Sequence, residues 1–269
     1  MHLAVVGHVE WVDFLRVDRV AGPGEIVQAM EAWQEAAGGG AAAVVQLLKL
    51  AGSATLFTAL GDDALGRTAF EDVGRRGVRV EAAWLTGPQR RAVVFLDACG
   101  ERAITLLSPK LVPHRSDPLP WDELAEVDGV YFTGGDAEAL RAARQARVLV
   151  ATARELQTLQ EAAVQLDVLV SSANDEGERY ERGDLEPAPR YVVRTEGARG
   201  GTVAPGGRFP PAELPGNLVD AYGAGNAFAA GLTYALARGM PMDDALAVGA
   251  RCGAAVLTGR GAYDGQLTA

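Results

Sequence analysis

The sequence predicts one α/β domain, spanning residues 1–269, with a central and mostly parallel sheet flanked by helices. In the second half of the chain, short apolar strands alternate with helical segments rich in Ala, Arg and Glu, which is typical of βαβ units. The composition, with 48% hydrophobic and 22% charged residues, is that of an ordinary globular domain. No internal repeat or low-complexity linker divides the chain. Two regions, near 15–30 and 90–107, are predicted to add a small β elaboration.

Periodicity and breaker residues define the elements of the first half. Residues 3–9 form a short apolar run with a glycine-containing turn, which indicates a buried strand. A Gly-Pro-Gly stretch interrupts residues 15–30 and favours small strands over a helix. Apolar residues at helical spacing predict a helix over 38–51. A strand at 54–60, a helix at 63–76 and a hairpin of strands 92–97 and 102–107, with its turn at 98–101, complete this half.

The second half supplies most of the predicted parallel sheet and ends in two helices. Pro241 starts the last helix, and Gly239 separates it from the helix before. The predicted strands are 129–133, 148–151, 167–170 and 191–194, and the two helices are 224–238 and 241–258.

Charge and cysteine usage limit the partners and the compartment. The formal net charge of −10 argues against nucleic acid and anionic membranes, because phosphate groups are bound by clustered Lys and Arg. Cys99 and Cys252 show no metal or redox spacing, which favours a reducing compartment. No signal peptide is indicated, and no apolar run is long enough to cross a membrane. We therefore expect a soluble protein of the cytoplasm.

Several common catalytic and nucleotide-binding motifs are absent from the sequence. Neither G-x-x-x-x-G-K-[ST] nor G-x-G-x-x-G occurs, which argues against a P-loop and a dinucleotide-binding fold. H-E-x-x-H, C-x-x-C and G-x-S-x-G are also missing, which argues against the usual zinc, redox and serine-hydrolase sites. The three histidines are scattered along the chain, so a histidine metal site is not expected.

The clearest chemical signal is Gly223-Ala224-Gly225, which opens a predicted helix. A Gly-x-Gly turn at a helix start presents unpaired backbone N–H groups and the positive end of the helix dipole. Such a terminus binds a phosphate or a developing oxyanion without a basic side chain. The alternative is a glycine-rich helix start that only allows close packing. Asp220 precedes the turn and is expected to cap or support it.

With two further motifs, this turn resembles the signatures of the ribokinase-like (PfkB) carbohydrate kinases. The C-terminal match is D-A-Y-G-A-G-N-A-F at residues 220–228. The N-terminal match combines G-G-G at 38–40, a helix, and G-D-D-A-L-G at 61–66. A third match, T-E-G-A-R-G at 195–200, is similar to the family's nucleotide loop. The resemblance implies a ribokinase-like fold in which the two β regions form a small lid.

The resemblance implies transfer of the ATP γ-phosphoryl group to a sugar hydroxyl, supported by Mg²⁺. Asp13 matches the family's sugar-hydroxyl acceptor, with a solvated turn residue as the alternative. The backbone of Gly38 and Gly39 matches the segment that approaches the sugar, with helix packing as the alternative. The lid would close over the sugar and exclude water, and it is either a plain flap or the seam of a homodimer. Candidates for sugar specificity are Glu10, Trp11 and Arg91.

The same resemblance assigns the phosphoryl and nucleotide contacts. Gly223, Ala224 and Gly225 would form the anion hole for the transferring phosphoryl group. Thr195, Gly197 and Gly200 would line the nucleotide, although a plain strand-end turn also explains them.

Two positions depart from the family pattern in the sugar and metal sites. The family's Asn in the helix after Gly-Gly, which holds the sugar, is Ala43 here. The family's Asn-x-x-Glu, which organises the Mg²⁺ shell through water, falls on Ser172 and Asp175. We expect Asp175 to support the metal through water, with an acidic helix start as the alternative. Further candidates beside it are Asn174, Glu176 and Glu178.

A third departure concerns catalysis, because Asn226 stands where the family has its catalytic Asp. That Asp accepts the proton of the attacking hydroxyl, whereas an amide cannot keep a proton at neutral pH. Losing a general base costs about 10²–10⁴-fold in rate. Three explanations fit: an engineered substitution that traps substrates, a natural sugar or nucleotide sensor, or another group acting as base in a slow enzyme. A nucleoside or vitamin-precursor kinase is a further alternative.

Overall fold

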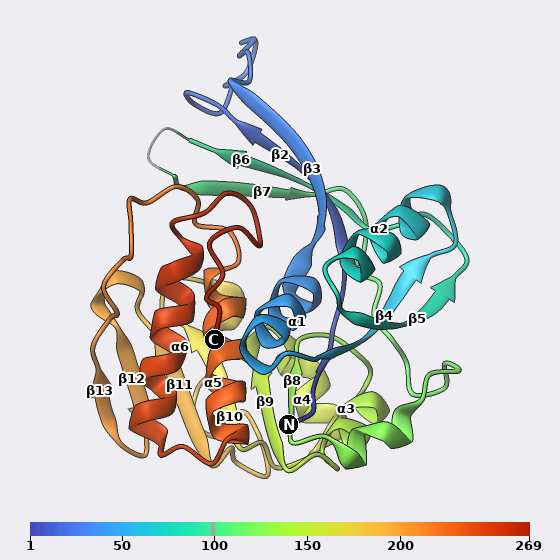
Figure 1. Cartoon of the computed structure of the whole chain (residues 1–269), viewed down its shortest axis with the longest axis vertical. Helices are drawn as coiled ribbons and strands as arrows, with labels where there is room; N and C mark the ends of the chain where they lie inside the picture. The colour runs from blue at the N-terminus through green and yellow to red at the C-terminus, as the bar shows by residue number, and fades with distance from the viewer. Residues whose placement is uncertain (98–99) are drawn as a thin grey trace.

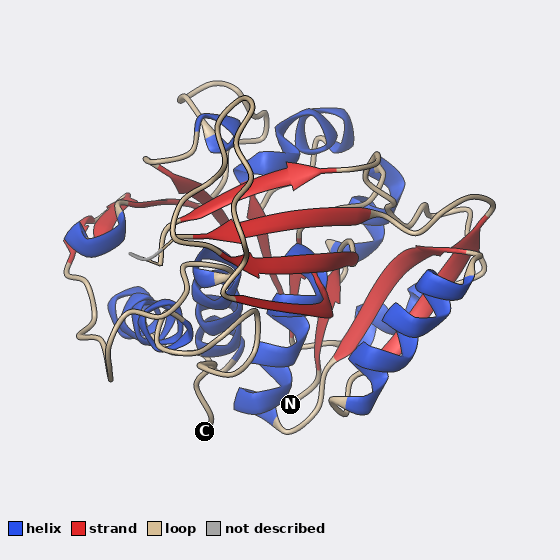
Figure 2. Cartoon of the chain, turned by 90° about the horizontal axis from the view of Figure 1, so that it is seen from above, coloured by secondary structure: helices blue, strands red, loops and turns tan. Residues whose placement is uncertain are grey.

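The computed structural model describes residues 1–97 and 100–269 and contains two sheets (Figure 1). The larger has nine strands with helices on both faces, as Figure 2 shows from above, and the smaller has four strands. This arrangement confirms the predicted α/β class with a central, mostly parallel sheet. Ala98 and Cys99, in the turn of the predicted hairpin, lie outside the described residues. Within the described residues, no helix has the length and apolar character needed to cross a membrane.

The larger sheet has the strand order β13-β12-β11-β10-β9-β8-β1-β4-β5. Its strands from β11 to β5 run parallel, and β12 and β13 add an antiparallel edge. Because parallel strands end at one edge, residues distant in sequence meet at the carboxyl edge of this sheet. The strands are β1 (Leu3–Val6), β4 (Thr55–Gly61), β5 (Arg79–Leu85), β8 (Gly129–Phe132), β9 (Val148–Thr152), β10 (Val168–Ser172), β11 (Tyr191–Thr195), β12 (Gly201–Ala204) and β13 (Gly207–Phe209).

Both faces of this sheet are buried under helices. Leu3 and Val5 belong to a core shared with α1, α5 and α6, whereas Ala4 and Val6 belong to a second core shared with α3 and α4. Burial on both faces explains why β1 is a continuous apolar run without alternation. The helices are α1 (Gly38–Ala51), α2 (Ala64–Arg75), α3 (Ala137–Ala143), α4 (Leu156–Ala162), α5 (Ala224–Ala237) and α6 (Met242–Val256), and short 3₁₀ turns are η1 (Trp121–Glu126), η2 (Ala153–Glu155), η3 (Glu176–Glu178) and η4 (Gly197–Arg199).

Most of the predicted elements occur within two residues of the expected bounds, including α1, α5 and the hairpin strands. The predicted strand at 3–9 already ends at Val6, because the chain leaves the sheet toward the second sheet. Within the larger sheet, strands β5, β12 and β13 were not predicted. All three lie at or next to the sheet edges, where little of a strand needs to be apolar.

The smaller sheet, with the loop 17–30 at its tip, is called the lid below. Its order is β3-β2-β6-β7. The prediction of strands within 15–30 is wrong for residues 17–30, because β2 ends at Arg16 and β3 begins at Glu31. Most of the loop between them is exposed, Ile26 completely so. The predicted β structure at 90–107 is confirmed as an antiparallel pair, β6 with β7. The strands are β2 (Glu10–Arg16), β3 (Glu31–Ala37), β6 (Arg91–Leu96) and β7 (Arg102–Leu106).

The G-D-D-A-L-G motif fixes the lid to the larger sheet. Asp63 caps α2 by accepting a hydrogen bond from Gly66 N (2.7 Å), and its second oxygen accepts one from Gln89 N (3.1 Å), just before β6. A Cβ on Gly66 would lie 2.0 Å from the carbonyl oxygen of Gly61. The motif therefore requires glycine for close backbone approach and positions the start of the hairpin.

Candidate active site

The Gly-Ala-Gly turn lies at the start of α5, as predicted. Gly223 is the N-cap residue and has a φ of 83°, in the left-handed region that favours glycine. No side chain of the described residues caps this helix start, and Gly225 is exposed. The first backbone N–H groups of α5 are therefore available to an anion at the positive end of the helix dipole.

Asp220 supports this turn, in agreement with its predicted role. Its fully buried side chain accepts hydrogen bonds from the backbone N–H groups of Tyr222 (2.8 Å) and Gly261 (2.9 Å). Burial raises the pKa of the Asp220 carboxyl group, although both bonds oppose the rise. Since backbone N–H groups bond both of its oxygens, Asp220 stabilises the loop before α5.

Gly39 and Asn226 lie next to each other, so the structure brings together the N-terminal G-G-G motif and the C-terminal motif at 220–228. These two residues and their neighbours are called the Gly39–Asn226 cluster below. A Cβ placed on Gly39 would lie 3.2 Å from Asn226 Oδ1 and 2.7 Å from the Thr133 hydroxyl oxygen, at the end of β8. Gly38 has a φ of +90° and donates its N–H to the Tyr222 hydroxyl (3.0 Å). Glycine at 38 and 39 thus allows the backbone of α1 to approach the start of α5.

Tyr131, on β8, contacts the side chain of Asn226. Its hydroxyl group lies 3.3 Å from Asn226 Oδ1, and the tyrosine is 2% exposed. Burial raises the pKa of the Tyr131 hydroxyl group, so it stays protonated at neutral pH and donates to the amide oxygen. Asn226 is therefore held between Tyr131 and the backbone of Gly39 in a defined orientation.

Asp13 does not join this cluster, in contrast to its predicted role at the sugar. Val12 and Phe14 lie on the inner face of the lid. Phe14 packs on Tyr222, with the centroids of the two rings 5.0 Å apart. Side chains alternate along a strand, so Asp13 projects from the opposite, outer face. There it pairs with Arg91 (2.9 Å) and with Gln34. The carboxylate of Asp13 therefore links β2 to the neighbouring strands β6 and β3 of the lid.

Glu10, on the inner face of β2, is the acidic residue beside the Gly-Gly segment. Its side chain is 8% exposed and accepts a hydrogen bond from Arg90 Nε (2.7 Å). His8 Nε2 lies 3.3 Å from Glu10 and 3.2 Å from Gly39 N. Burial opposes ionisation of Glu10, but the contacts with His8 and Arg90 outweigh it and hold its pKa at about 2. Burial chiefly lowers the pKa of His8, and its contact with Glu10 opposes that shift.

The predicted nucleotide residues lie on neighbouring turns at the carboxyl edge of the sheet. Thr195 pairs with Ser172 at the ends of β11 and β10. Gly197 has a φ of +60°, and a Cβ there would lie 3.4 Å from Asn174 Nδ2 on the adjacent turn. Gly200 is different, because a Cβ would lie 2.1 Å from the carbonyl oxygen of Phe209. Close packing against β13 accounts for that glycine.

Three carboxylates, those of Asp175, Glu176 and Glu178, follow β10. Asp175 caps η3 through Gly177 N (2.9 Å) and pairs with Arg154, which also lies 3.4 Å from Glu178. Burial raises the pKa of Glu178, and its charge in turn raises the pKa of Tyr131. Among the described residues, no group of three His, Cys, Asp or Glu side chains could hold a metal. In kinase sites Mg²⁺ is commonly held by one or two carboxylates, water and the phosphates of the substrate. These carboxylates fit that kind of coordination and not a site made of protein ligands alone.

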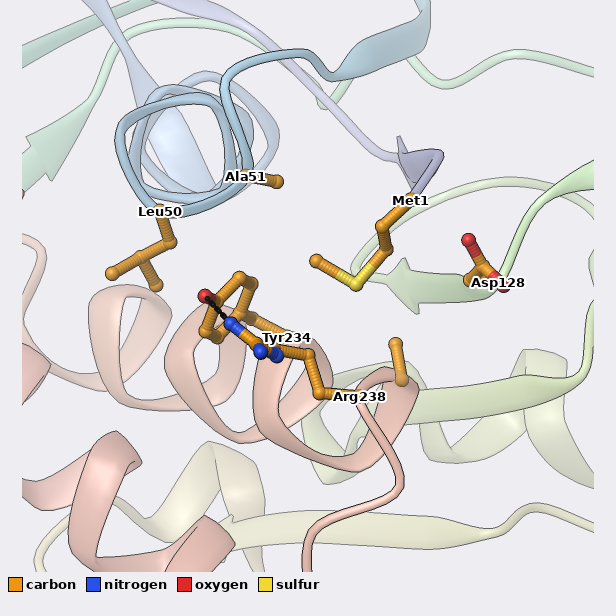
Figure 3. A pocket seen from close by; sticks show the side chains of 7 residues that line it. Met1, Leu50, Ala51, Asp128, Tyr234 and Arg238 are labelled. Atoms are coloured by element: carbon orange, nitrogen blue, oxygen red, sulfur yellow. Dashed lines mark hydrogen bonds between the residues drawn. The ribbon is translucent and has the colours of Figure 1, made fainter. Parts of the chain in front are cut away.

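Two cavities lie away from this cluster. One cavity, of about 550 Å³, lies near the C-terminal end of α5, whereas Asn226 lies near the N-terminal end of the same helix. Figure 3 shows Tyr234 and Arg238 on its wall. The lining residues are Met1, Leu50, Ala51, Asp128, Tyr234, Ala237 and Arg238. Another of about 370 Å³ lies on the outer face of the lid, beside Asp13 and Leu15. Neither cavity contains a residue of the Gly39–Asn226 cluster.

Sequence reasoning did not predict His8 or Tyr131. His8 follows β1, and Tyr131 belongs to β8, its parallel neighbour. The signal that could have found them is position, because polar residues at the ends of adjacent central strands in a parallel sheet converge on one site. Glu10 was expected only as a specificity residue, yet it lies beside Gly38 and Gly39.

Comparisons with known proteins agree with this arrangement. The profile of the pfkB family of carbohydrate kinases matches residues 1–269. The ATP-dependent ribose-1-phosphate kinase of Halopiger xanaduensis is 30% identical, over 92% of this chain and 89% of that protein. Among solved structures, Thermotoga maritima ribokinase has a TM-score of 0.79 at 22% identity, covering 99% of this chain and 96% of that one. Arabidopsis thaliana ribokinase, complexed with ribose and ATP, has a TM-score of 0.78 at 18% identity, covering 99% and 95%. The chain therefore belongs to the pfkB family of carbohydrate kinases and is a phosphotransferase.

Proposed function

We propose that this protein transfers the γ-phosphoryl group of ATP to a hydroxyl group of a ribose derivative. The observation that carries the proposal is the meeting of Gly39, Asn226 and the uncapped start of α5. A sugar hydroxyl beside Gly39 would lie next to the side chain of residue 226 and the anion-binding amides. Ribose 1-phosphate is the first acceptor to test, because a relative at 30% identity is a ribose-1-phosphate kinase.

The proposed chemistry depends on position and electrostatics. The N–H groups of Gly223, Ala224 and Gly225 would stabilise the charge of the transferring phosphoryl group. Glu10 would accept a sugar hydroxyl in place of Asp13, because Glu10 is ionised and lies beside Gly38. Thr195 and Gly197 would contact the nucleotide.

Mg²⁺ would neutralise the charge of the ATP phosphates in this reaction. We assign its support through water to the turn that carries Asp175 and Glu178. Glu178 is the stronger candidate, because its charge acts on Tyr131 at the centre of the site. Arg154 contacts both carboxylates, but Asp175 also accepts a hydrogen bond from Gly177 N.

Asn226 determines how fast such a reaction can run. Tyr131 donates to its amide oxygen, and an amide cannot keep the proton that leaves the attacking hydroxyl. Binding of sugar and nucleotide would survive, while turnover would fall by about 10²–10⁴-fold for lack of a general base. A sugar or nucleotide sensor is the second candidate function, and Asn226 is the observation that favours it.

Turnover of the Asn226→Asp variant tests the proposal. We expect the variant to phosphorylate ribose or ribose 1-phosphate at least ~10²-fold faster than the parent protein, since the carboxylate restores a proton acceptor. Calorimetric titration with MgATP and the same acceptors should show binding for both proteins. An unchanged, near-zero rate in the variant with binding intact would favour the sensor. Absence of nucleotide binding by both proteins would contradict both functions.

We also propose that the protein acts in the cytoplasm and forms a homodimer through the outer face of the lid. This face carries the partly exposed apolar residues Leu15, Val93 and Phe95. Apolar groups left partly open on a sheet face favour a protein partner over solvent.

A further inference from the structure

Arg102, the first residue of β7, extends from the lid to the loop before α5. Its Nη1 group donates a hydrogen bond to the carbonyl oxygen of Ala221, two residues before Gly223. Across the lid sheet, Arg102 pairs with Leu96, which is fully buried and in turn pairs with Arg16. Cross-strand partners share a face, and Arg16 shares the face of Phe14, so Arg102 leaves the lid from its inner face.

Other contacts already hold the lid to this loop. The N–H of Ala221 donates to the carbonyl oxygen of Gly100 (3.2 Å), at the end of the hairpin. Arg16 Nη1 lies 3.5 Å from the carbonyl oxygen of Val219. The lid is therefore joined to this loop by contacts that do not involve the Arg102 side chain.

Among residues 1–97 and 100–269, the charge of Arg102 has no anionic partner. Among the described ion pairs none involves Arg102, whereas Arg16 and Arg90 each contact a carboxylate. In the described part of the chain, its side chain donates one hydrogen bond, to a neutral carbonyl oxygen. A guanidinium group offers five donors in a planar fork that matches phosphate, so most of its binding capacity is unused.

The charge of Arg102 acts on residues at both sides of the proposed phosphoryl site. Burial raises the pKa values of Asp220, Tyr222 and Glu178, and the charge of Arg102 partly opposes each rise. Asp220 and Tyr222 lie directly before the Gly-Ala-Gly turn, and Glu178 lies on the turn after β10. The guanidinium group is therefore within electrostatic reach of both sides of the site.

We infer that Arg102 is a phosphate-binding residue that the lid delivers to the N–H groups at the start of α5. An anion at these N–H groups would draw the guanidinium group from the Ala221 carbonyl oxygen, which cannot compete with a charged acceptor. Lid closure and phosphate binding then strengthen each other. This inference rests on the proposed function, since it assigns a second, charged contact to the same phosphoryl site.

Two phosphates could be the partner: the γ-phosphate of ATP or a phosphate on the acceptor sugar. They share the chemistry that the guanidinium group recognises, so the ligands in the test must separate them. MgATP compared with MgADP isolates the γ-phosphate. Ribose 1-phosphate compared with ribose isolates the phosphate of the acceptor.

Calorimetric titration of the Arg102→Ala variant with these four ligands tests the inference. We expect the variant to bind one phosphate-bearing member of a pair about 10- to 100-fold more weakly, while the member that lacks that phosphate changes less than about twofold. Loss confined to MgATP assigns the γ-phosphate, and loss confined to ribose 1-phosphate assigns the acceptor. Arg102→Lys should recover part of the affinity, because it restores the charge without the planar fork.

The matched control is Arg19→Ala, which removes another arginine of the lid. Arg19 pairs with Glu25 on the loop at the lid tip, so all four affinities should stay within about twofold of the parent values. Thermal unfolding of each variant without ligand checks that the fold is intact. Unchanged affinities of Arg102→Ala for both phosphate-bearing ligands, with the parent protein binding them, would overturn the inference and leave the proposed function standing. Failure of the parent protein to bind any nucleotide would overturn both.

Discussion

Glu35, on β3, should make the stability of the protein depend on pH, and one substitution should remove that dependence. Its side chain is 14% exposed and accepts a hydrogen bond from the N–H of Ala262 (2.8 Å). Burial raises its pKa from 4.5 to about 7, with Asp72 and Asp264 adding to the rise and Ala262 and Arg76 opposing it. Arg76 Nη2 lies 3.5 Å from the carboxylate, too far to offset the burial.

The sign follows from proton binding. Between pH 4.5 and 7 the folded protein holds a proton on Glu35 that the unfolded chain releases, so the free energy of unfolding falls as pH rises through this range. The full effect corresponds to about 3.4 kcal/mol at 1.36 kcal/mol per pKa unit. About 2.5 kcal/mol of it lies between pH 5 and pH 8. Glu35→Gln keeps an oxygen for Ala262 but cannot ionise, so this decrease should vanish.

Urea unfolding of the parent and the variant at pH 5, 6, 7 and 8 measures this difference. Relative to the parent, Glu35→Gln should gain about 2.5 kcal/mol between pH 5 and pH 8. Other groups, such as His8 with its lowered pKa, act equally in both proteins and cancel. Glu123→Gln serves as a control: its partner Arg79 lowers the pKa of Glu123, so its difference from the parent should stay constant over this range. A constant difference for Glu35→Gln as well would refute the reasoning.

Two further predictions concern the proposed site and the lid. Gly39→Ala should raise the KM for the sugar at least ~10-fold, because the new Cβ would lie 2.7 Å from the Thr133 hydroxyl oxygen and 3.2 Å from Asn226 Oδ1 and would displace both groups. Steady-state kinetics in the Asn226→Asp background measures this KM. An unchanged KM would place the sugar elsewhere. Light scattering should give a mass of about twice 28.1 kDa, and Phe95→Glu, on the outer face of the lid, should halve it; a parent protein of monomer mass would contradict the lid dimer.

The parts of the fold and site that sequence could predict are those set by local chemistry. Glycine at 38, 39 and 223 is needed where the backbone turns with positive φ or approaches another segment, so the motif and the geometry coincide. Helical periodicity set the bounds of α1 closely. Asp220 could be assigned a supporting role because an acidic residue before a glycine turn commonly bonds local N–H groups.

The remaining parts depend on contacts that sequence order does not contain. Asp13 and Glu10 are both acidic residues after β1, and only the register of β2 decides which one lies on the inner face. Tyr131 lies at the centre of the sheet because β8 pairs with β1, and its register partner there, Val5, is 126 residues away in the sequence. Arg102 acts on the loop before α5 through the pairing of β6 with β7. The loop 17–30 contains apolar residues without burial, so composition alone suggested strands there.

The surroundings of Asn226 make it a clean test of what a single proton acceptor contributes. Asn and Asp have the same shape, and Tyr131 can donate to Oδ1 of either, because burial keeps its hydroxyl group protonated. The side chain of residue 226 also lies beside Gly39, where a Cβ would come within 3.2 Å of Oδ1. Exchange of the amide for a carboxylate therefore changes charge and basicity while the position of the group stays fixed. A rate difference between the two proteins then reports proton transfer itself, and a difference in MgATP affinity reports the repulsion between a carboxylate and the phosphate beside it.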